Sequence, residues 1–147
     1  MKYQRLLTLQ KNHILTPKSF LYKWDTSALG WQLTKPSIIV RSSYRLEDGN
    51  EQSYAGFFQS IWPISIDDIH SIKNAIQTIR KDAKEKLTAE NKPNDGFDVF
   101  IQEYQEIDSG GVIFIQDDKL FLQYSNGGNG TNNIVNGIAP DATLYLQ

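Results

Sequence analysis

Cysteine is absent from this sequence, and methionine occurs once. The lack of cysteine excludes a disulfide framework and any metal site built from thiolates, and it is compatible with a reducing cytosol. Acidic and basic residues nearly balance, with 15 Lys and Arg against 17 Asp and Glu and a formal net charge of −2. That balance gives no electrostatic reason to expect nucleic acid or an anionic membrane as a partner. No apolar run approaches the roughly 20 residues of a membrane span, so we expect a cytoplasmic protein.

The length of 147 residues predicts a single domain that is large enough for a sizeable hydrophobic core. Apolar residues make up 39% of the chain and charged residues 22%, as in an ordinary globular domain. Within residues 1–147 we expect two lobes. The first, residues 1–93, contains an arginine-bearing stretch and the clearest helix, and the second, residues 94–147, is rich in β-formers.

The most regular pattern lies between Ser65 and Asn91 and predicts one long amphipathic helix from Asp67 to about Glu90. Ser65 is a natural N-cap, because its hydroxyl can accept a hydrogen bond from the first turn. Asparagine, proline and glycine after Glu90 end the pattern. Six apolar residues recur at spacings of three and four and form one face of this helix: Ile69, Ile72, Ile76, Ile79, Ala83 and Leu87.

Beyond residue 96 the pattern changes from the helical period to that of β-strands. Phe97–Tyr104 is rich in β-formers, and the segments Val112–Gln116 and Leu120–Tyr124 flank a polar turn. The two flanking segments are therefore predicted to pair as an antiparallel hairpin. The fold class predicted from these elements is α+β, with the long helix packed on a mostly antiparallel sheet that includes all three segments.

One stretch carries groups that suit a phosphate. Ile38, Ile39 and Val40 predict a buried strand, and Arg41 follows them as a fixed, always-charged fork at the strand's end. The hydroxyls of Ser42 and Ser43 come next, and the turn Tyr54-Ala55-Gly56 would let a backbone approach a ligand closely. The alternative is an arginine paired with Glu47 or Asp48 at the start of a loop. The residues alone favour neither interpretation.

The stretch resembles a known signature. Residues 40–56, read as VRSS…EDG…SYAG, are similar to the V-R-S-S-x-x-x-E-D and S-F-A-G motifs in the ATP-binding domain of phosphoenolpyruvate synthases and pyruvate, phosphate dikinases. Two later stretches resemble the same family in the same order. Residues 99–114 are similar to its V-x-V-Q-x-M…S-G-V-x-F motif, and Asn136–Asp141 is similar to its S-G-x-V-x-P-D motif.

The resemblance implies an ATP-grasp fold that binds Mg-ATP and passes phosphate to a histidine on a separate phosphocarrier domain or partner chain. It implies phosphate contacts from six residues: Arg41, Ser42, Ser43, Tyr54, Ala55 and Gly56. It implies adenine contacts from four more: Gln102, Glu103, Tyr104 and Gln105.

Two parts of the family's machinery are missing or altered. The glycine-rich G-G-K-G motif, whose lysine contacts the phosphates, is absent, and Lys11, Lys18 and Lys23 are possible replacements that lie between no glycines. A glutamate that the family uses as a Mg-ATP ligand corresponds to Gln123, and a neutral amide is a poor substitute on a hard cation. We therefore expect weakened magnesium binding and assign no metal ligand and no catalytic residue.

Two functions follow from the resemblance. The chain is either the ATP-binding part of a kinase-type phosphotransferase, or a catalytically inactive nucleotide-binding or protein-interaction module on the same scaffold. In both cases this chain alone is expected to transfer no phosphate.

Overall fold

The computed structural model describes residues 2–22, 33–45, 57–117, 119–127 and 139–146. The chain divides into two compact units, Met1–Tyr104 and Gln105–Gln147. The described residues form two helices and two antiparallel sheets, which confirms the α+β class. The boundary follows Tyr104 rather than residue 93, because the strand at residues 97–103 belongs to the sheet of the first unit.

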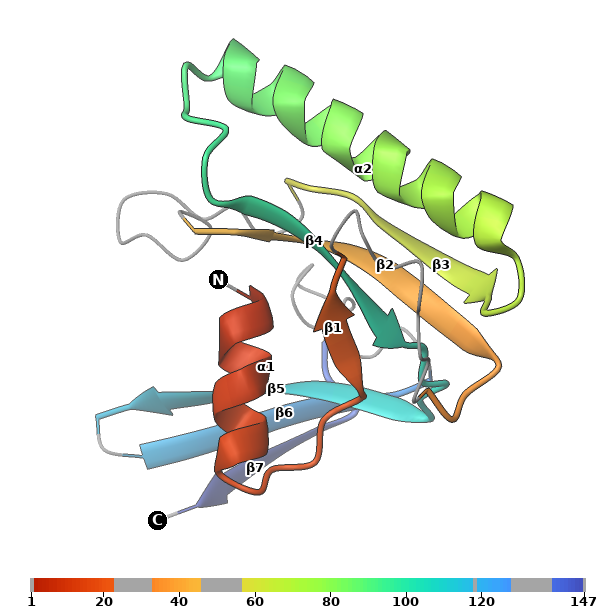
Figure 1. Cartoon of the computed structure of the whole chain (residues 1–147). Coiled ribbons are helices and arrows are strands. Elements are labelled where there is room, and N and C mark those ends of the chain that lie inside the picture. Colours follow the sequence, from red (N-terminus) through yellow and green to blue (C-terminus); the bar gives the residue numbers. More distant parts are fainter. Residues whose placement is uncertain (1, 23–32, 46–56, 118, 128–138, 147) are drawn as a thin grey trace. The chain divides into compact units, whose positions relative to one another are not determined.

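The first unit contains a four-stranded antiparallel sheet in the spatial order β1-β4-β2-β3 (Figure 1). Its strands are β1 (Ser19–Leu21), β2 (Ser37–Tyr44), β3 (Ser60–Ser65) and β4 (Phe97–Glu103). The strands predicted from residue 37 and from residue 97 are thus confirmed as β2 and β4. These two occupy the centre of the sheet and pair from Ile38↔Glu103 to Tyr44↔Phe97.

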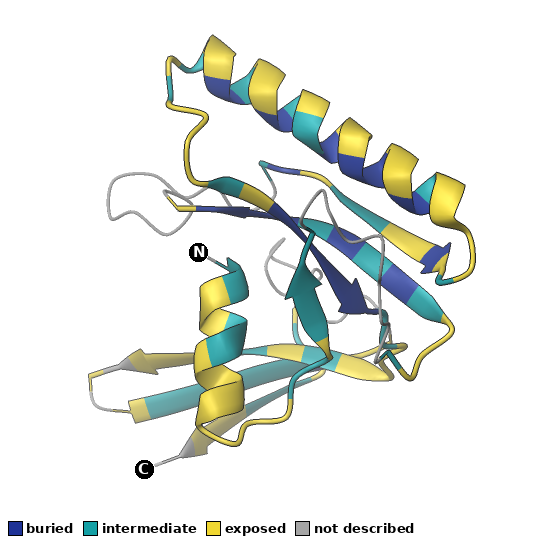
Figure 2. Cartoon of the chain, in the orientation of Figure 1, coloured by how far each residue is buried: buried dark blue, intermediate teal, exposed yellow. Residues whose placement is uncertain are grey.

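The predicted long helix is confirmed as α2 (Ile69–Ala89), which packs on one face of this sheet. Figure 2 shows its inner side buried and its outer side exposed along the whole length. The apolar core between helix and sheet combines alternate residues of β2 and β4 with one stripe of α2. From α2 the buried residues are Ile72, Ala75, Ile76, Ile79, Ala83 and Leu87.

The two ends of α2 are set by specific caps. Asp68, not Ser65, is the N-cap, and its carboxylate accepts hydrogen bonds from the backbone N and the hydroxyl of Ser71 at 2.9 and 2.6 Å. At the other end Asn91 adopts a left-handed φ of 53°. The backbone N of Asn91 then donates to Thr88 O, and that of Lys92 donates to Leu87 O, the paired bonds of a Schellman motif.

A second helix, α1 (Lys2–Lys11), contacts the sheet face opposite α2. In the sequence, Leu6, Leu7 and Leu9 are compatible with the start of either a short helix or a strand. The ring of Tyr3 lies 5.7 Å from that of Phe100, and its backbone N donates to Ser43 Oγ at 3.2 Å. None of the helices that the structure describes is long and apolar enough to cross a bilayer.

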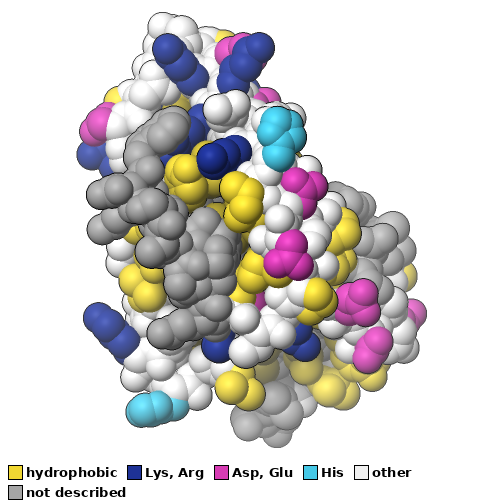
Figure 3. All heavy atoms as spheres, turned by 45° about the vertical axis from the view of Figure 1, so that its right-hand side comes forward, with side chains coloured by type: hydrophobic (Ala, Val, Ile, Leu, Met, Phe, Trp, Pro, Cys, Tyr) yellow, Lys and Arg dark blue, Asp and Glu magenta, His cyan; other side chains and the backbone are white. Residues whose placement is uncertain are grey.

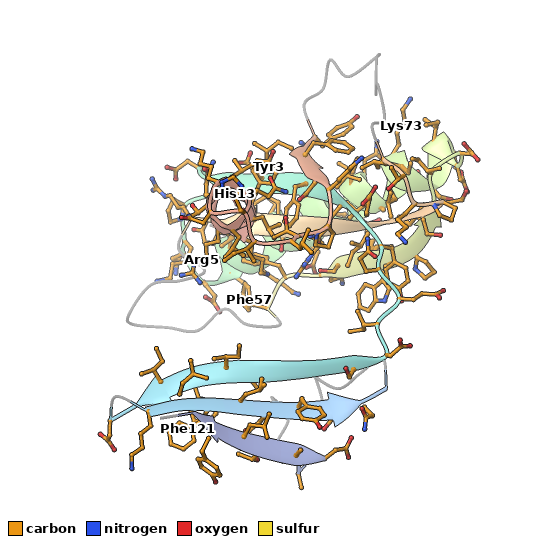
Figure 4. The ribbon with its side chains drawn as sticks, turned by 90° about the horizontal axis from the view of Figure 1, so that it is seen from below. Tyr3, Arg5, His13, Phe57, Lys73 and Phe121 are labelled. Carbon is orange, nitrogen blue, oxygen red and sulfur yellow. The ribbon has the colours of Figure 1, made fainter. Side chains whose placement is uncertain are left out.

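The second unit contains a separate sheet in the order β5-β6-β7, made of β5 (Ser109–Gln116), β6 (Lys119–Asn126) and β7 (Ala142–Leu146). The predicted hairpin is confirmed as β5–β6. The prediction that it would share a sheet with residues 99–104 is wrong, because β4 belongs to the sheet of the first unit, whereas β5 and β6 form a separate sheet with β7. An aromatic row crosses the three strands through Phe114, Phe121 and Tyr145 (Figure 4).

Candidate functional site

Arg41 lies in the middle of the first sheet rather than at a strand's end. β2 continues through Ser42 and Ser43 to Tyr44, so the arginine does not point past the sheet as expected. Successive side chains of a strand alternate between faces. Val40 and Tyr44 face α2, and Arg41 therefore lies on the face that α1 contacts, where it is half-buried.

Two residues of the neighbouring strand hold the guanidinium of Arg41. Its Nη1 donates to Gln102 Oε1 at 3.0 Å, and its Cζ lies 5.8 Å from the centre of the Phe100 ring. Phe100 is directly opposite Arg41 in the β2–β4 register and fully buried. On the other side of β2, Ser60 of β3 is directly opposite Arg41 and so lies on the same face.

The two serines after Arg41 lie on opposite faces, because neighbouring residues of a strand alternate. Ser43 shares the face of Arg41, and its hydroxyl accepts a hydrogen bond from Tyr3 N of α1. Ser42 lies on the α2 side with 0% exposure, and its Oγ has no hydrogen-bond partner among the described residues. Ser42 therefore does not join Arg41 in one cluster. Tyr54, Ala55 and Gly56, and the alternative partners Glu47 and Asp48, are outside the described residues.

The four adenine candidates lie where β4 ends. Gln102 is 5% exposed and accepts from Arg41. The backbone N of Glu103 donates to Lys18 O at 2.8 Å and that of Tyr104 to Ser37 O at 2.9 Å. These two N–H groups are therefore already used within the chain. Gln105 is half-buried at the start of the second unit.

The carboxylate of Glu103 is tied to the segment that leads into β2. Its Oε1 accepts from the backbone N of Thr34 at 2.6 Å and from the Thr34 hydroxyl at 3.0 Å. Burial raises the pKa of the Glu103 carboxyl, but these two hydrogen bonds and the backbone and charge of Lys18 outweigh burial and lower the pKa below its ordinary value of 4.5. Glu103 is thus an ionised residue that fastens the entry to β2.

Gln123 belongs to β6 in the second unit, where it pairs with Val112 and Thr143 and is half-buried. No group of three or more metal-ligating side chains occurs in the described part of the chain. Of the lysines considered as replacements, Lys11 is in the last turn of α1 and Lys18 precedes β1, both exposed, while Lys23 is not described.

Two surface hollows of the first unit lie on the α2 side of the sheet, not on the face of Arg41. One of about 410 Å³ lies between β3 and the first half of α2, lined by residues that include Ile61, Pro63 and Asn74. The other, of about 230 Å³, is lined by Tyr22, Lys73, Ile76 and Gln77. On the view in Figure 3, the described cationic and acidic side chains form no continuous field of one sign.

Sequence reasoning missed Tyr3, Phe100 and Ser60 as neighbours of the site. Alternation along 97–103 already places Phe100 and Gln102 on one face of a strand, but nothing local indicates which strand lies beside it. Comparisons with protein-family models, curated proteins and solved structures found no match for this chain.

Proposed function

We propose that the first unit binds a nucleotide through its phosphate groups, with Arg41 as the main phosphate contact. The chain would then be the ATP-binding part, of ATP-grasp type, of a phosphotransferase resembling phosphoenolpyruvate synthase and pyruvate, phosphate dikinase. One observation carries the proposal: Arg41 Nη1 donates to Gln102 Oε1 at 3.0 Å. That bond joins two of the three motifs on which the resemblance rests, at positions far apart in sequence.

The chemistry around Arg41 supports a phosphate ligand. A guanidinium presents N–H donors in a planar fork that matches phosphate oxygens in pairs. Ser60 and Ser43 add hydroxyls on the same sheet face. A nucleotide ligand also places the proposed activity in the cytoplasm, where ATP is found.

Replacing the arginine tests the proposal. Losing a charge-assisted hydrogen bond costs about 1.5–3 kcal/mol, so Arg41→Ala should bind ATP roughly ten- to a hundredfold more weakly in calorimetry. The control is Arg45→Ala, which removes an exposed arginine that pairs with Asp95 at 2.9 Å. Equal ATP affinity of Arg41→Ala and the parent refutes the role. Loss of folding in Arg41→Ala, judged by circular dichroism, supports a structural ion pair instead.

We further propose that this chain binds ATP without transferring its phosphate, and that a histidine-bearing phosphocarrier domain or partner chain would be the acceptor. Phosphoryl transfer depends on positioning and on cations that neutralise the phosphates. The glycine-flanked lysine is absent here, and Gln123 stands in place of an acid. ATP hydrolysis by the unmodified chain contradicts the proposal.

One set of contacts favours the second candidate, a catalytically inactive nucleotide-binding or protein-interaction module. The Ser43 hydroxyl and the N–H groups of Glu103 and Tyr104, all expected to meet the nucleotide, are used within the chain. Thermal shifts with ATP, ADP and AMP, each with and without magnesium, separate the two candidates. If all three nucleotides raise the melting temperature equally with and without magnesium, the inactive nucleotide-binding module is favoured. If none of them changes the melting temperature, the protein-interaction module is favoured.

A further inference from the structure

We propose that Gln102 is a positioning residue that holds the Arg41 guanidinium for a phosphate, and that it does not contact adenine. This inference rests on the proposed function and assigns Gln102 a different role within it. The resemblance implied an adenine contact at this position, whereas the geometry points to the arginine.

The contacts confine Arg41 from two directions. Gln102 is diagonal to Arg41 across the β2–β4 pair, since its own partner in register is Ile39. Its amide oxygen accepts from Nη1 at 3.0 Å, and the buried Phe100 ring lies under the guanidinium. A long arginine side chain loses rotamer freedom when it binds a ligand. A guanidinium already held by an amide and a ring loses less of that freedom on binding.

Burial separates the two roles of Gln102. Its side chain is 5% exposed, so a base would find almost none of its surface, whereas Arg41 is half-buried. The amide oxygen, one of the groups that would recognise adenine, is committed to the arginine. Gln102 can therefore affect a nucleotide chiefly through Arg41.

The neutrality of the amide matters as much as its position. An uncharged acceptor takes one of the five N–H donors of a guanidinium and, unlike a carboxylate, brings no negative charge of its own beside it. A carboxylate at the same place would form an ion pair with Arg41 and compete with phosphate for it. Glutamine thus orients the arginine without neutralising it.

The test compares a ligand that has a base with one that has none. Calorimetry would measure the binding of ATP and of inorganic tripolyphosphate to the full chain and to the variants Gln102→Ala and Gln102→Glu. We expect Gln102→Ala to lower the affinity for both ligands by the same factor, about two- to tenfold. Gln102→Glu should lower both affinities further. Gln77→Ala, on the exposed side of α2, is the matched control and should change neither affinity.

A double-mutant cycle distinguishes positioning from a general structural effect. In the Arg41→Ala background, Gln102→Ala should cause no further loss, because residues that act as one unit are non-additive. Gln102→Glu keeps the size of the side chain and provides the readout if the alanine variant does not fold.

Three results overturn the inference: a loss confined to ATP, no loss in either Gln102 variant, or full additivity with Arg41→Ala. A parent protein that binds neither ATP nor tripolyphosphate overturns the proposed function itself and this inference with it. That failure is visible before any variant is made.

Discussion

At the scale of single residues, the first sheet buries polar side chains at positions where an apolar pattern would place only hydrophobic residues. Ser42 and Glu103 are both buried, yet they differ in the hydrogen bonds that their side-chain oxygens make. Within the part of the chain that the structure describes, the Ser42 hydroxyl has no hydrogen-bond partner, whereas the Glu103 carboxylate accepts two hydrogen bonds from Thr34. Only the Glu103 arrangement stabilises the fold, because a buried polar group without a hydrogen bond costs free energy.

The charge of Glu103 makes stability depend on pH. Its pKa is lowered in the folded state, so its contribution is fully present above the unfolded pKa and is lost as the pH falls through the folded pKa. Glu103→Gln should lower the urea midpoint at neutral pH and flatten the decline of that midpoint below about pH 4.5. Glu106→Gln, which changes an exposed glutamate, is the control. Parallel pH profiles for Glu103→Gln and the parent would show that the carboxylate is not linked to folding.

At the scale of elements, the apolar stripe of α2 holds the helix on the sheet, and its caps set where the helix begins and ends. The helix ends where Asn91 turns into the left-handed region, a conformation that asparagine tolerates and β-branched residues resist. The carbonyls of Leu87 and Thr88 are satisfied only because that turn is made.

Changing the C-terminal residue of this motif tests its role. Asn91→Val should reduce the free energy of unfolding by about 1–2 kcal/mol, because valine has to adopt the strained backbone. Asn91→Gly should match or exceed the parent, since glycine adopts positive φ without strain. Urea unfolding followed by far-ultraviolet circular dichroism measures both. An unaffected valine variant would mean that the helix ends elsewhere in solution.

Elements with a long or regular pattern were predictable, and short or interrupted ones were not. The stripe of α2 and the β-rich runs of β2, β4 and β5–β6 are visible in sequence, whereas β1 has three residues and β3 contains Pro63. Contacts between strands that are distant in sequence were even harder to predict. Arg41 and Gln102 are 61 positions apart, and no spacing rule shows that they meet.

At the scale of the whole molecule, the two units differ in how much core they possess. The first has apolar clusters between α2 and its sheet. Among the residues of the second unit whose side-chain burial the structure describes, no apolar side chain is buried, and Ile113 and Ile115 are 65% and 74% exposed. Three strands need a covered hydrophobic face for independent stability.

That difference predicts how the two units behave apart. A fragment of residues 1–104 should keep a helical circular dichroism signal and unfold cooperatively in urea, because its core lies within it. A fragment of residues 105–147 should give a spectrum without cooperative unfolding. The full chain, measured under the same conditions, is the reference. Cooperative unfolding of the second fragment would contradict the account of its core.

The pairing of β2 with β4 also affects the order in which parts of the first unit fold. Ile38 pairs with Glu103, so this contact closes a long loop that contains β3 and α2, and such long closures are slow. By contrast, the β5–β6 hairpin and the caps of α2 form through contacts between residues that are close in sequence. We expect pulsed hydrogen exchange to find α2 amides protected before those of β2. During synthesis, β2 can pair with β3, but its other edge stays without a partner until β4 has been made, and misassociation of the nascent chain would begin at that edge.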